Sequence, residues 1–182
     1  VLQKRRRARE NCRAGCAIHG RCVPDVMSID IARAEGGPEM EIVRTLFLEY
    51  QAAINVDLCF QGFEEELATL PGLYAPPKGC LLLAVDGDEV AGVVGVRPLE
   101  ENNKAEIKRL YVRSPWRGTG LGRRLAIRAV ETARKVGFAT LCLDTLGFMT
   151  EARTLYKSLG FFEIPAYYDN PLDGVVYMEM SL

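Results

Sequence analysis

The sequence predicts a mixed α/β (α+β) domain whose strands and helices follow the order βααβββαβαββ. Apolar residues recur at helical spacing in some segments and alternate with polar residues in others. Glycine, proline or Asp-Gly turns separate these segments. A chain of 182 residues is long enough for one domain with a sizeable core, and we find neither a repeat nor a second domain boundary.

The first half is expected to contain one strand, two helices and three further strands. Alternation at 28–34 predicts a strand. Pro38 suits the first position of a helix, whose apolar face comprises Ile42, Val43, Leu46, Phe47 and Tyr50. A second helix fits 62–70, and three prolines in 71–79 predict an irregular loop. The strands are expected at 80–85, 89–96 and 103–112, with Asp86-Gly87-Asp88 as the hairpin turn between the first two.

The second half is expected to alternate helices and strands. An apolar stripe that starts at Leu121 and ends before Gly137 predicts a long helix. A strand follows at 139–145, and a helix at 150–160 ends on Gly160. The closing strands are expected at 161–164 and 175–182.

Composition and charge narrow the function classes. The chain is 48% hydrophobic and 26% charged, as soluble globular proteins are, and its net charge is -1. Seven basic residues fall in 1–26, so the remainder is mildly acidic and does not resemble a nucleic-acid binder. The densest apolar run, 80–85, is far shorter than the ~20 residues of a membrane helix. No apolar stretch follows the basic start, so we expect a cytoplasmic protein.

Four zinc-type ligands cluster near the beginning of the chain: Cys12, Cys16, His19 and Cys22. Structural zinc sites usually pair short Cys-x2-4-Cys units across a longer loop, whereas these ligands are crowded together and no apolar scaffold follows. We therefore expect no metal, and we interpret residues 1–27 as a disordered or spurious basic leader.

The ordered pattern begins just after Met27, which we take as a hypothetical natural start, with the domain spanning 28–182. N-terminal sequencing of the protein made from its native gene tests this start. The three remaining cysteines, Cys59, Cys80 and Cys142, are expected to be buried thiols because their neighbours are apolar.

A glycine-rich turn, RGTGLG at 117–122, lies between a predicted strand and a predicted helix. Helix N-termini present unpaired N–H groups, and glycines allow a phosphate to approach the backbone closely. Arg117, Arg123 and Arg124 add positive charge, so the turn predicts a pyrophosphate site. A plain tight turn is the alternative. The turn is not a Walker A loop, because no Lys-Ser/Thr pair follows it. It is not a complete dinucleotide-binding fingerprint either, because Arg123 stands where that motif has its third glycine.

Two motifs make residues 28–182 resemble the GNAT superfamily of acetyl-CoA-dependent N-acetyltransferases. The first comprises Arg117, Gly120 and Gly122, and the second comprises Ala152, Tyr156, Gly160 and Phe161. The resemblance implies a three-layer α/β/α fold with a central, mostly antiparallel and splayed sheet. It also implies an enzyme with acetyl-CoA as co-substrate and no metal.

The resemblance assigns the cofactor-binding residues. The pyrophosphate would meet Arg117, Gly118, Thr119, Gly120, Leu121, Gly122 and Arg123. The pantetheine arm would lie along Leu110, Tyr111 and Val112, with a backbone N–H near Val112 facing the thioester carbonyl. Many members carry asparagine where this chain has Met149, so pantetheine binding would rely on backbone groups or Thr150.

Two catalytic residues follow from the same resemblance. Glu106 matches a base that some members use, and Tyr156 matches the acid that protonates the departing thiolate. Glu106 could instead be a solvated carboxylate or a partner of Lys108, and Tyr156 could be a core residue. Strand alternation predicts that Glu106, Lys108, Leu110 and Val112 share one face and that Arg109 lies on the other.

The acceptor is left open. A small-molecule amine is the first hypothesis, a protein N-terminus or lysine the second, and a non-catalytic acyl-CoA sensor the third. Carboxylates and aromatic rings that suit a cationic amine occur at Glu64, Glu65, Glu66, Tyr74, Tyr167, Tyr168 and Asp169. Three consecutive glutamates on a short helix are, however, more often a solvated face. Residues 74–79 could form a rigid lid over the cleft. No nucleic-acid or membrane partner is expected, and a homodimer is left open.

Overall fold

The computed structural model describes residues 29–100 and 103–182. The predicted leader at 1–27, its cysteine and histidine cluster and the hypothetical start at Met27 lie outside these residues, so they stay predictions.

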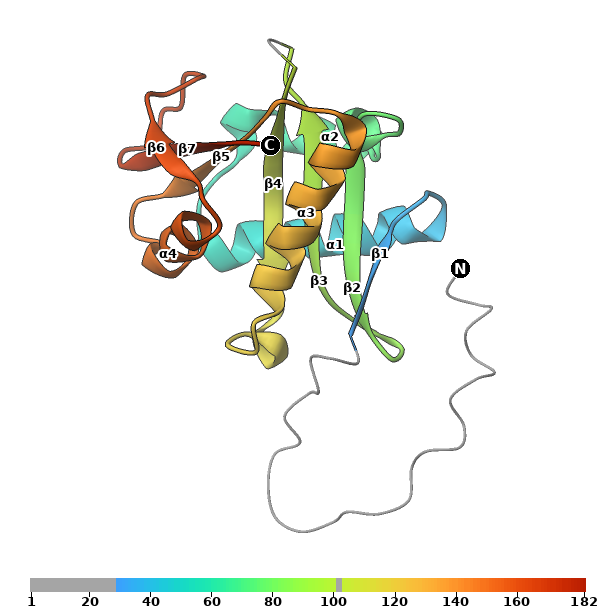
Figure 1. The fold of residues 1–182 in the computed structure, drawn as a ribbon. Helices are drawn as coiled ribbons and strands as arrows, with labels where there is room; N and C mark the ends of the chain where they lie inside the picture. The colour runs from blue at the N-terminus through green and yellow to red at the C-terminus, as the bar shows by residue number, and fades with distance from the viewer. Residues whose placement is uncertain (1–28, 101–102) are drawn as a thin grey trace.

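A seven-stranded sheet forms the centre of the described chain, in the order β1-β2-β3-β4-β5-β7-β6 (Figure 1). Its strands are β1 (Asp30–Arg33), β2 (Cys80–Asp86), β3 (Glu89–Pro98), β4 (Lys104–Val112), β5 (Thr140–Leu146), β6 (Phe162–Ile164) and β7 (Val175–Ser181). Neighbouring strands are antiparallel except β4 and β5, which are parallel. The predicted element order and the mostly antiparallel sheet are confirmed.

Helices cover both faces of the sheet, as the three-layer prediction requires (Figure 1). They are α1 (Pro38–Ile54), α2 (Phe63–Thr69), α3 (Leu121–Val136) and α4 (Thr150–Ser158). One buried cluster joins α1 and α2 to the sheet through residues such as Val43 and Phe63. The other joins α3 and α4 to the opposite face through residues such as Leu125 and Tyr156.

Local signals explain where the helices begin and end. Pro38 occupies the first turn of α1, and Asn55 closes that helix in the left-handed conformation, with its N–H bonded to the Gln51 carbonyl. Gly120 and Gly137 flank α3, both at positive φ, which glycine adopts without a Cβ penalty. These are the boundaries that the sequence predicts for the two long helices.

The loop at 71–79 differs from its prediction in two ways. It contains a short 3-10 turn, η4 (Gly72–Tyr74), although three prolines suggested irregular structure. Tyr74 is 3% exposed, packs edge-on against Phe47 at 5.9 Å and lies so close to Gly95 that a Cβ there would be 2.5 Å from its ring. Tyr74 thus anchors the loop in the core, whereas residues 76–78 are exposed. None of residues 74–79 lines the first or the second cavity described below, so the structure does not support a lid there.

The cysteine prediction is correct for two of the three positions. Cys80 and Cys142 are buried, whereas Cys59 is exposed, in the short 3-10 turn η3 (Cys59–Gln61). Burial of Cys59 was predicted from its apolar neighbours, but it is the neighbouring Leu58 whose side chain packs in the core.

A bulge in β4 changes which of its side chains share a face. The pairing steps from Gly95↔Lys108 to Val93↔Tyr111, and Arg109 has a φ of 56°. Leu110 and Val112 pack on the α3 side, whereas Tyr111 packs on the α1 side. The predicted alternation is therefore wrong beyond Lys108, because the extra residue in the bulge puts Arg109 on the same face as Lys108.

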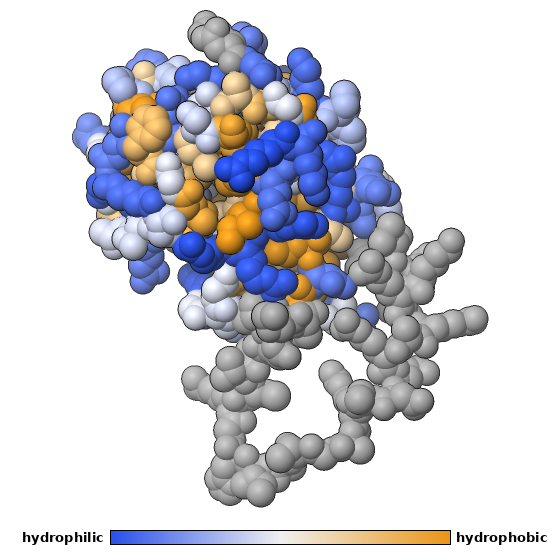
Figure 2. All heavy atoms as spheres, viewed as in Figure 1, coloured by the Kyte–Doolittle hydropathy of each residue, from blue (hydrophilic) through white to orange (hydrophobic). Residues whose placement is uncertain are grey.

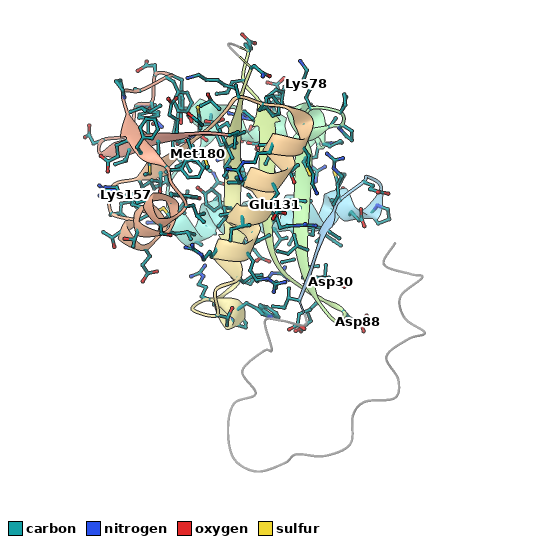
Figure 3. All side chains as sticks on the ribbon, viewed as in Figure 1. Asp30, Lys78, Asp88, Glu131, Lys157 and Met180 are labelled. Atoms are coloured by element: carbon teal, nitrogen blue, oxygen red, sulfur yellow. The ribbon has the colours of Figure 1, made fainter. Side chains whose placement is uncertain are left out.

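Charged and apolar side chains are interspersed on the face that α3 covers (Figure 2). Glu131 lies on the outward side of α3, where it pairs with Arg128 at 3.1 Å (Figure 3). Within 29–100 and 103–182, no helix combines the length and apolar character that crossing a membrane requires.

Candidate functional site

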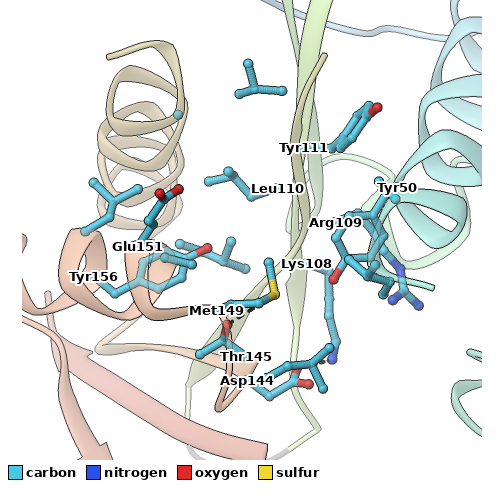
Figure 4. A pocket seen from close by; sticks show the side chains of 18 of the residues that line it. Tyr50, Lys108, Arg109, Leu110, Tyr111, Asp144, Thr145, Met149, Glu151 and Tyr156 are labelled. Atoms are coloured by element: carbon cyan, nitrogen blue, oxygen red, sulfur yellow. Dashed lines mark hydrogen bonds and ion pairs between the residues drawn. The ribbon is translucent and has the colours of Figure 1, made fainter. Parts of the chain in front are cut away.

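The main cavity lies where β4 and β5 diverge. These strands pair only through Lys104↔Thr140, Ala105↔Leu141 and Glu106↔Cys142, although β4 continues to Val112 and β5 to Leu146. A cavity of about 680 Å³ follows the divergence and is lined by both strands and by residues of α1, α3 and α4. We call it the first cavity; Figure 4 shows Tyr156 entering it from one side and Tyr50 from the other.

Most of the predicted cofactor-binding residues line the first cavity. They are Leu110, Tyr111, Val112, Arg117, Gly118, Gly120, Gly122 and Arg123. The two others do not line it. Thr119 donates its hydroxyl to the Trp116 carbonyl at 2.6 Å, and the Leu121 side chain is fully buried in the core. These two residues can contribute to a ligand site here only through their backbone.

The glycine-rich turn has the geometry of an anion site. Gly118 and Gly120 have φ values of 77° and 87°, and a Cβ on either would meet no atom within 4 Å, so the backbone conformation and not the space requires glycine. The turn leads directly into α3, whose first N–H groups have no partners within the helix. Unpaired N–H groups at a helix N-terminus fit a pyrophosphate.

Two arginines of this segment are held by specific bonds. Arg117 donates Nε to the Val112 carbonyl at 2.8 Å, and its guanidinium lies 5.6 Å from the Tyr111 ring centre. Arg123 donates Nη1 to Ser158 Oγ at 2.6 Å, which connects the start of α3 to the end of α4. Both line the cavity, so positive charge faces the opening in a fixed arrangement.

Tyr156 points into the first cavity from α4. The residue is 7% exposed, and its ring packs edge-on against Phe161 at 5.6 Å. Burial raises the pKa of its phenol well above the ordinary value, and the nearby Tyr50 and Asp144 raise that pKa further. The hydroxyl therefore stays protonated at neutral pH and can donate a proton or a hydrogen bond.

Glu106 does not line the first cavity. It lines a second cavity of about 470 Å³, although only 1% of it is exposed. Its carboxylate accepts hydrogen bonds from Arg97 Nε at 2.9 Å and from the Tyr167 hydroxyl at 2.5 Å, and it pairs with Lys108 Nζ at 3.3 Å. The structure therefore pairs Glu106 with Lys108, as one sequence alternative proposed, and places it apart from Tyr156.

The two cavities meet at Lys108 and Gln61, which line both. Lys108 also forms an ion pair with Asp144 of β5, toward which its side chain points in Figure 4. Its ammonium lies 5.2 Å from the Tyr168 ring centre. Sequence reasoning missed Asp144, although a lone acidic residue within the apolar strand at 139–145 is a usable signal.

Arg109 forms a buried ion pair that sequence reasoning also missed. Its Nη2 lies 2.6 Å from Glu66 Oε2, and the two side chains are 3% and 9% exposed. Its Nη1 donates to Gln61 Oε1 at 3.0 Å, and its guanidinium lies 4.9 Å from the Phe63 ring centre. Glu66 also accepts a hydrogen bond from Tyr74 at 2.5 Å.

The residues predicted to contact an acceptor separate into three groups. Tyr167 and Tyr168 line the second cavity, as expected. Glu66 and Tyr74 are instead occupied with each other in the interior. Glu64, Glu65 and Asp169 are exposed and line neither cavity. Glu64 and Glu65 thus fit the alternative of a solvated helix face, and neither lines a described cavity.

Met149 stands at the start of α4 and lines the first cavity together with Thr150. Its sulfur accepts a hydrogen bond from the Thr145 hydroxyl at 3.9 Å. The position where the family resemblance suggested an asparagine is thus filled here by a thioether that contacts the neighbouring strand.

Comparisons with known proteins agree with this geometry. Residues 41–161 match the model of the acetyltransferase (GNAT) family. An uncharacterized N-acetyltransferase of Schizosaccharomyces pombe is 36% identical over 156 residues, which covers 85% of this chain and 96% of that protein. N-acetylaspartate synthetase of Rattus norvegicus is 37% identical over 119 residues, or 64% of this chain and 40% of that protein.

Solved structures share the fold. An acetyltransferase from Streptococcus agalactiae superposes with a TM-score of 0.69 at 20% identity, covering 85% of this chain and 99% of that one. An acetyltransferase from Bacillus subtilis, solved in complex with CoA, superposes with a TM-score of 0.61 at 23% identity and covers 85% of this chain and 99% of that one.

Proposed function

Because the chain belongs to the acetyltransferase (GNAT) family and is an acetyl-CoA-dependent N-acetyltransferase, we propose that its acceptor is a small-molecule amine that attacks the thioester directly in a ternary complex. One observation carries the proposal. The first cavity, with its glycine-rich turn, meets a second cavity at Lys108 and Gln61. The co-substrate in the first cavity and the acceptor in the second can therefore approach one another at these two residues.

The glycine-rich turn holds the pyrophosphate of acetyl-CoA. The N–H groups at the start of α3 donate to it, and the positive φ of Gly118 and Gly120 orients the turn for that contact. Arg117 and Arg123 supply positive charge at the rim, and Gly122 adds no side chain between the turn and Leu110. Thr119 and Leu121 contribute to pyrophosphate binding only through their backbone N–H groups.

The pantetheine arm lies in the gap between the strands. Beyond Glu106 the edge of β4 no longer pairs with β5, so backbone groups from Leu110 to Val112 face the first cavity. The Arg117 bond to the Val112 carbonyl holds the end of this edge in position. We therefore propose that the reacting end of the bound co-substrate lies between Lys108 and Tyr156.

Tyr156 donates its phenolic proton to the departing CoA sulfur. Its raised pKa keeps the proton on the oxygen at neutral pH, so the hydroxyl is present as a donor to the sulfur while negative charge develops there. The ring is held by Phe161, so the hydroxyl is positioned before the reaction begins.

The amine proton leaves toward Glu106 through Tyr167. An attacking amine must lose a proton, and because Glu106 lines the second cavity with only 1% exposure, we propose a relay through the Tyr167 hydroxyl. The Tyr167 hydroxyl lines the second cavity and donates to Glu106. As the amine nitrogen forms its bond to the acetyl carbon, its proton passes to the Tyr167 oxygen while the phenolic proton passes to Glu106.

A small acceptor fits the second cavity better than a protein chain does. The cavity is a pocket of about 470 Å³ beneath the segment that carries Tyr167 and Tyr168. Relatives named N-acetylaspartate synthetase are also consistent with a small acceptor. An N-terminal peptide or a lysine side chain is the competing substrate that the test must include.

Calorimetric titration of acetyl-CoA, CoA and ATP into the full chain is the first test. We expect acetyl-CoA and CoA to bind and ATP to bind at least tenfold more weakly. A panel of small amines and peptides, with CoA thiol release as the readout, then compares acceptor classes. Faster acetylation of peptides than of every small amine would refute the small-molecule acceptor.

A further inference from the structure

The basic side chains that line the second cavity are each paired with a carboxylate of the described chain. Arg97 bonds to Glu106 at 2.8 Å, and Lys104 bonds to Glu179 at 3.0 Å. Lys108 lies 3.3 Å from a Glu106 oxygen. These opposite charges cancel within the wall, so a charged group on a ligand would compete with ion pairs that the protein already makes.

The two tyrosine hydroxyls of the second cavity are occupied in the same way. Tyr167 donates its hydroxyl to Glu106 at 2.5 Å. The Tyr168 oxygen accepts hydrogen bonds from Gln61 Nε2 at 3.2 Å and from Asn170 Nδ2 at 3.0 Å. A hydroxyl oxygen has two acceptor positions, so both are filled on Tyr168. These bonds hold the two rings in place through their polar ends and leave ring surface for a ligand.

Aromatic and apolar surface therefore remains to bind a ligand in the second cavity. It is provided by Phe60, Leu99 and the rings of Tyr167 and Tyr168. Phe60 is 37% exposed, and within 29–100 and 103–182 no aromatic ring packs against it. Glu100 also lines the cavity, but it is exposed, so solvent and salt screen its charge. Walls of this kind are typical of pockets for apolar or aromatic ligand groups.

The aromatic wall lies within reach of the reacting amine. In the proposed function the amine nitrogen contacts the Tyr167 oxygen. That hydroxyl and the Lys108 ammonium contact the same oxygen of Glu106, at 2.5 and 3.3 Å, so the amine lies beside Lys108 where the cavities meet. The Lys108 ammonium is in turn 5.2 Å from the Tyr168 ring centre. A linker of two or three carbon atoms, at about 1.5 Å per bond, spans such a distance.

We propose that the acceptor is a primary amine whose short carbon chain ends in an aromatic ring, and that this ring binds in the second cavity against Phe60 and Tyr168. This proposal rests on the proposed function, because it uses the second cavity as the acceptor site. Aromatic pairs in edge-to-face or offset arrangements gain more than their buried area alone provides. Because hydrogen bonds already hold the tyrosine rings, little ordering of the wall opposes binding.

The test measures thiol release by the full chain at saturating acetyl-CoA. The probes are 2-phenylethylamine and 3-phenylpropylamine, each compared with its cyclohexyl analogue, and propylamine is the amine without a ring. Rates are expressed per unprotonated amine, because the basicities of these amines differ. We expect at least one phenyl amine to exceed propylamine in kcat/KM about tenfold or more, and its cyclohexyl analogue about threefold or more.

Two results of this comparison would overturn the proposal. Cyclohexyl analogues that equal or exceed their phenyl partners at both chain lengths would show that the cavity selects apolar volume and not an aromatic ring. Propylamine that equals both phenyl amines would show that the second cavity does not bind the body of the acceptor.

Two variants of Phe60 locate the effect in the second cavity. Phe60→Ala removes the ring and should raise KM for the preferred phenyl amine about tenfold, with kcat within about threefold and KM for propylamine unchanged. Phe60→Tyr retains a ring and should keep KM within about threefold of the parent value. Since Phe60 is 37% exposed, we expect both variants to fold, which thermal unfolding verifies. An equal rise in KM for both amines, or no rise for either, would overturn the proposal.

Phe162→Ala is the matched control, because Phe162 is 51% exposed on β6 and lines neither cavity. It should leave both KM values unchanged. If neither phenyl amine is acetylated but acetyl-CoA still binds in calorimetry, the aromatic-amine proposal fails while the cofactor site of the proposed function stands. If acetyl-CoA does not bind either, the proposed function fails together with the inference.

Discussion

Replacing Tyr156 with phenylalanine removes a single hydroxyl group from the wall of the first cavity. The ring that remains is buried and packs edge-on against Phe161 at 5.6 Å. Because this packing is retained, we expect the free energy of unfolding to change by less than about 1 kcal/mol, or about 2–4 °C in Tm. The substitution therefore separates catalysis from stability.

The expected loss is in kcat. General acid catalysis by a positioned side chain contributes at least about 10²-fold, which corresponds to about 2.7 kcal/mol of transition-state stabilisation. The Tyr156 hydroxyl contacts the sulfur only as the thioester bond breaks, so binding of acetyl-CoA should change less than about twofold. We expect kcat to fall about 100-fold or more with an unchanged Kd for acetyl-CoA.

The pH dependence gives a second readout with a defined sign. Burial raises the pKa of Tyr156, so the acid form persists at higher pH than it does for a free tyrosine, whose pKa is about 10. Activity that needs this acid is lost only as pH rises through the raised pKa. The ionisation of Tyr156 should therefore cause no decline in kcat below about pH 10.

The assay is steady-state thiol release, with calorimetry for acetyl-CoA binding and thermal unfolding for stability. Tyr50→Phe is the control, since Tyr50 brings a phenol to the opposite side of the same cavity (Figure 4). It should reduce kcat less than about threefold. A Tyr156→Phe enzyme with nearly unchanged kcat would refute the assignment of Tyr156 as the acid.

Three further outcomes are expected. Gly120→Val should lower stability by about 1–2 kcal/mol and weaken acetyl-CoA binding in calorimetry, because its φ of 87° is strained for a side chain; unchanged melting and binding would contradict this. Glu66→Leu should cost about 3–5 kcal/mol in urea unfolding by leaving Arg109 unpaired, and adding Arg109→Met should recover part of the loss. Iodoacetamide at pH 8 should label exposed Cys59 well before Cys142, whose pKa burial raises to about 11, leaving a thiolate fraction of about 10⁻³; peptide mass spectrometry that finds equal labelling would contradict this.

The element order and most boundaries could be predicted because their signals are local. Pro38 and Asn55 delimit α1, and Gly120 and Gly137 delimit α3, each within one turn of the residues that it affects. The position of the glycine-rich turn before α3 could be predicted for the same reason, since the turn and the helix that follows it are continuous in sequence. The divergence of β4 from β5 was implied only by the family resemblance.

The bulge at Arg109 could not be predicted from the local pattern. Positive φ usually occurs at glycine, and an arginine within an alternating strand shows no such signal. The bulged conformation is accompanied by an ion pair with Glu66 and a contact with Phe63, both more than 40 residues away in sequence. Those partners belong to α2, whose position depends on the whole fold.

Amino-acid order along the chain is thus sufficient to predict the helices, the strands and the glycine-rich turn, because neighbours in sequence determine them. The surroundings of the reacting groups depend on three-dimensional packing. Lys108 and Asp144 are 36 residues apart, yet they are in contact where the two cavities meet. Tyr167 and Glu106 are 61 residues apart, yet they are in contact in the second cavity. Contacts of this kind form only when the sheet brings separate strands together, because side chains can pair across a site only after the backbone has placed them there.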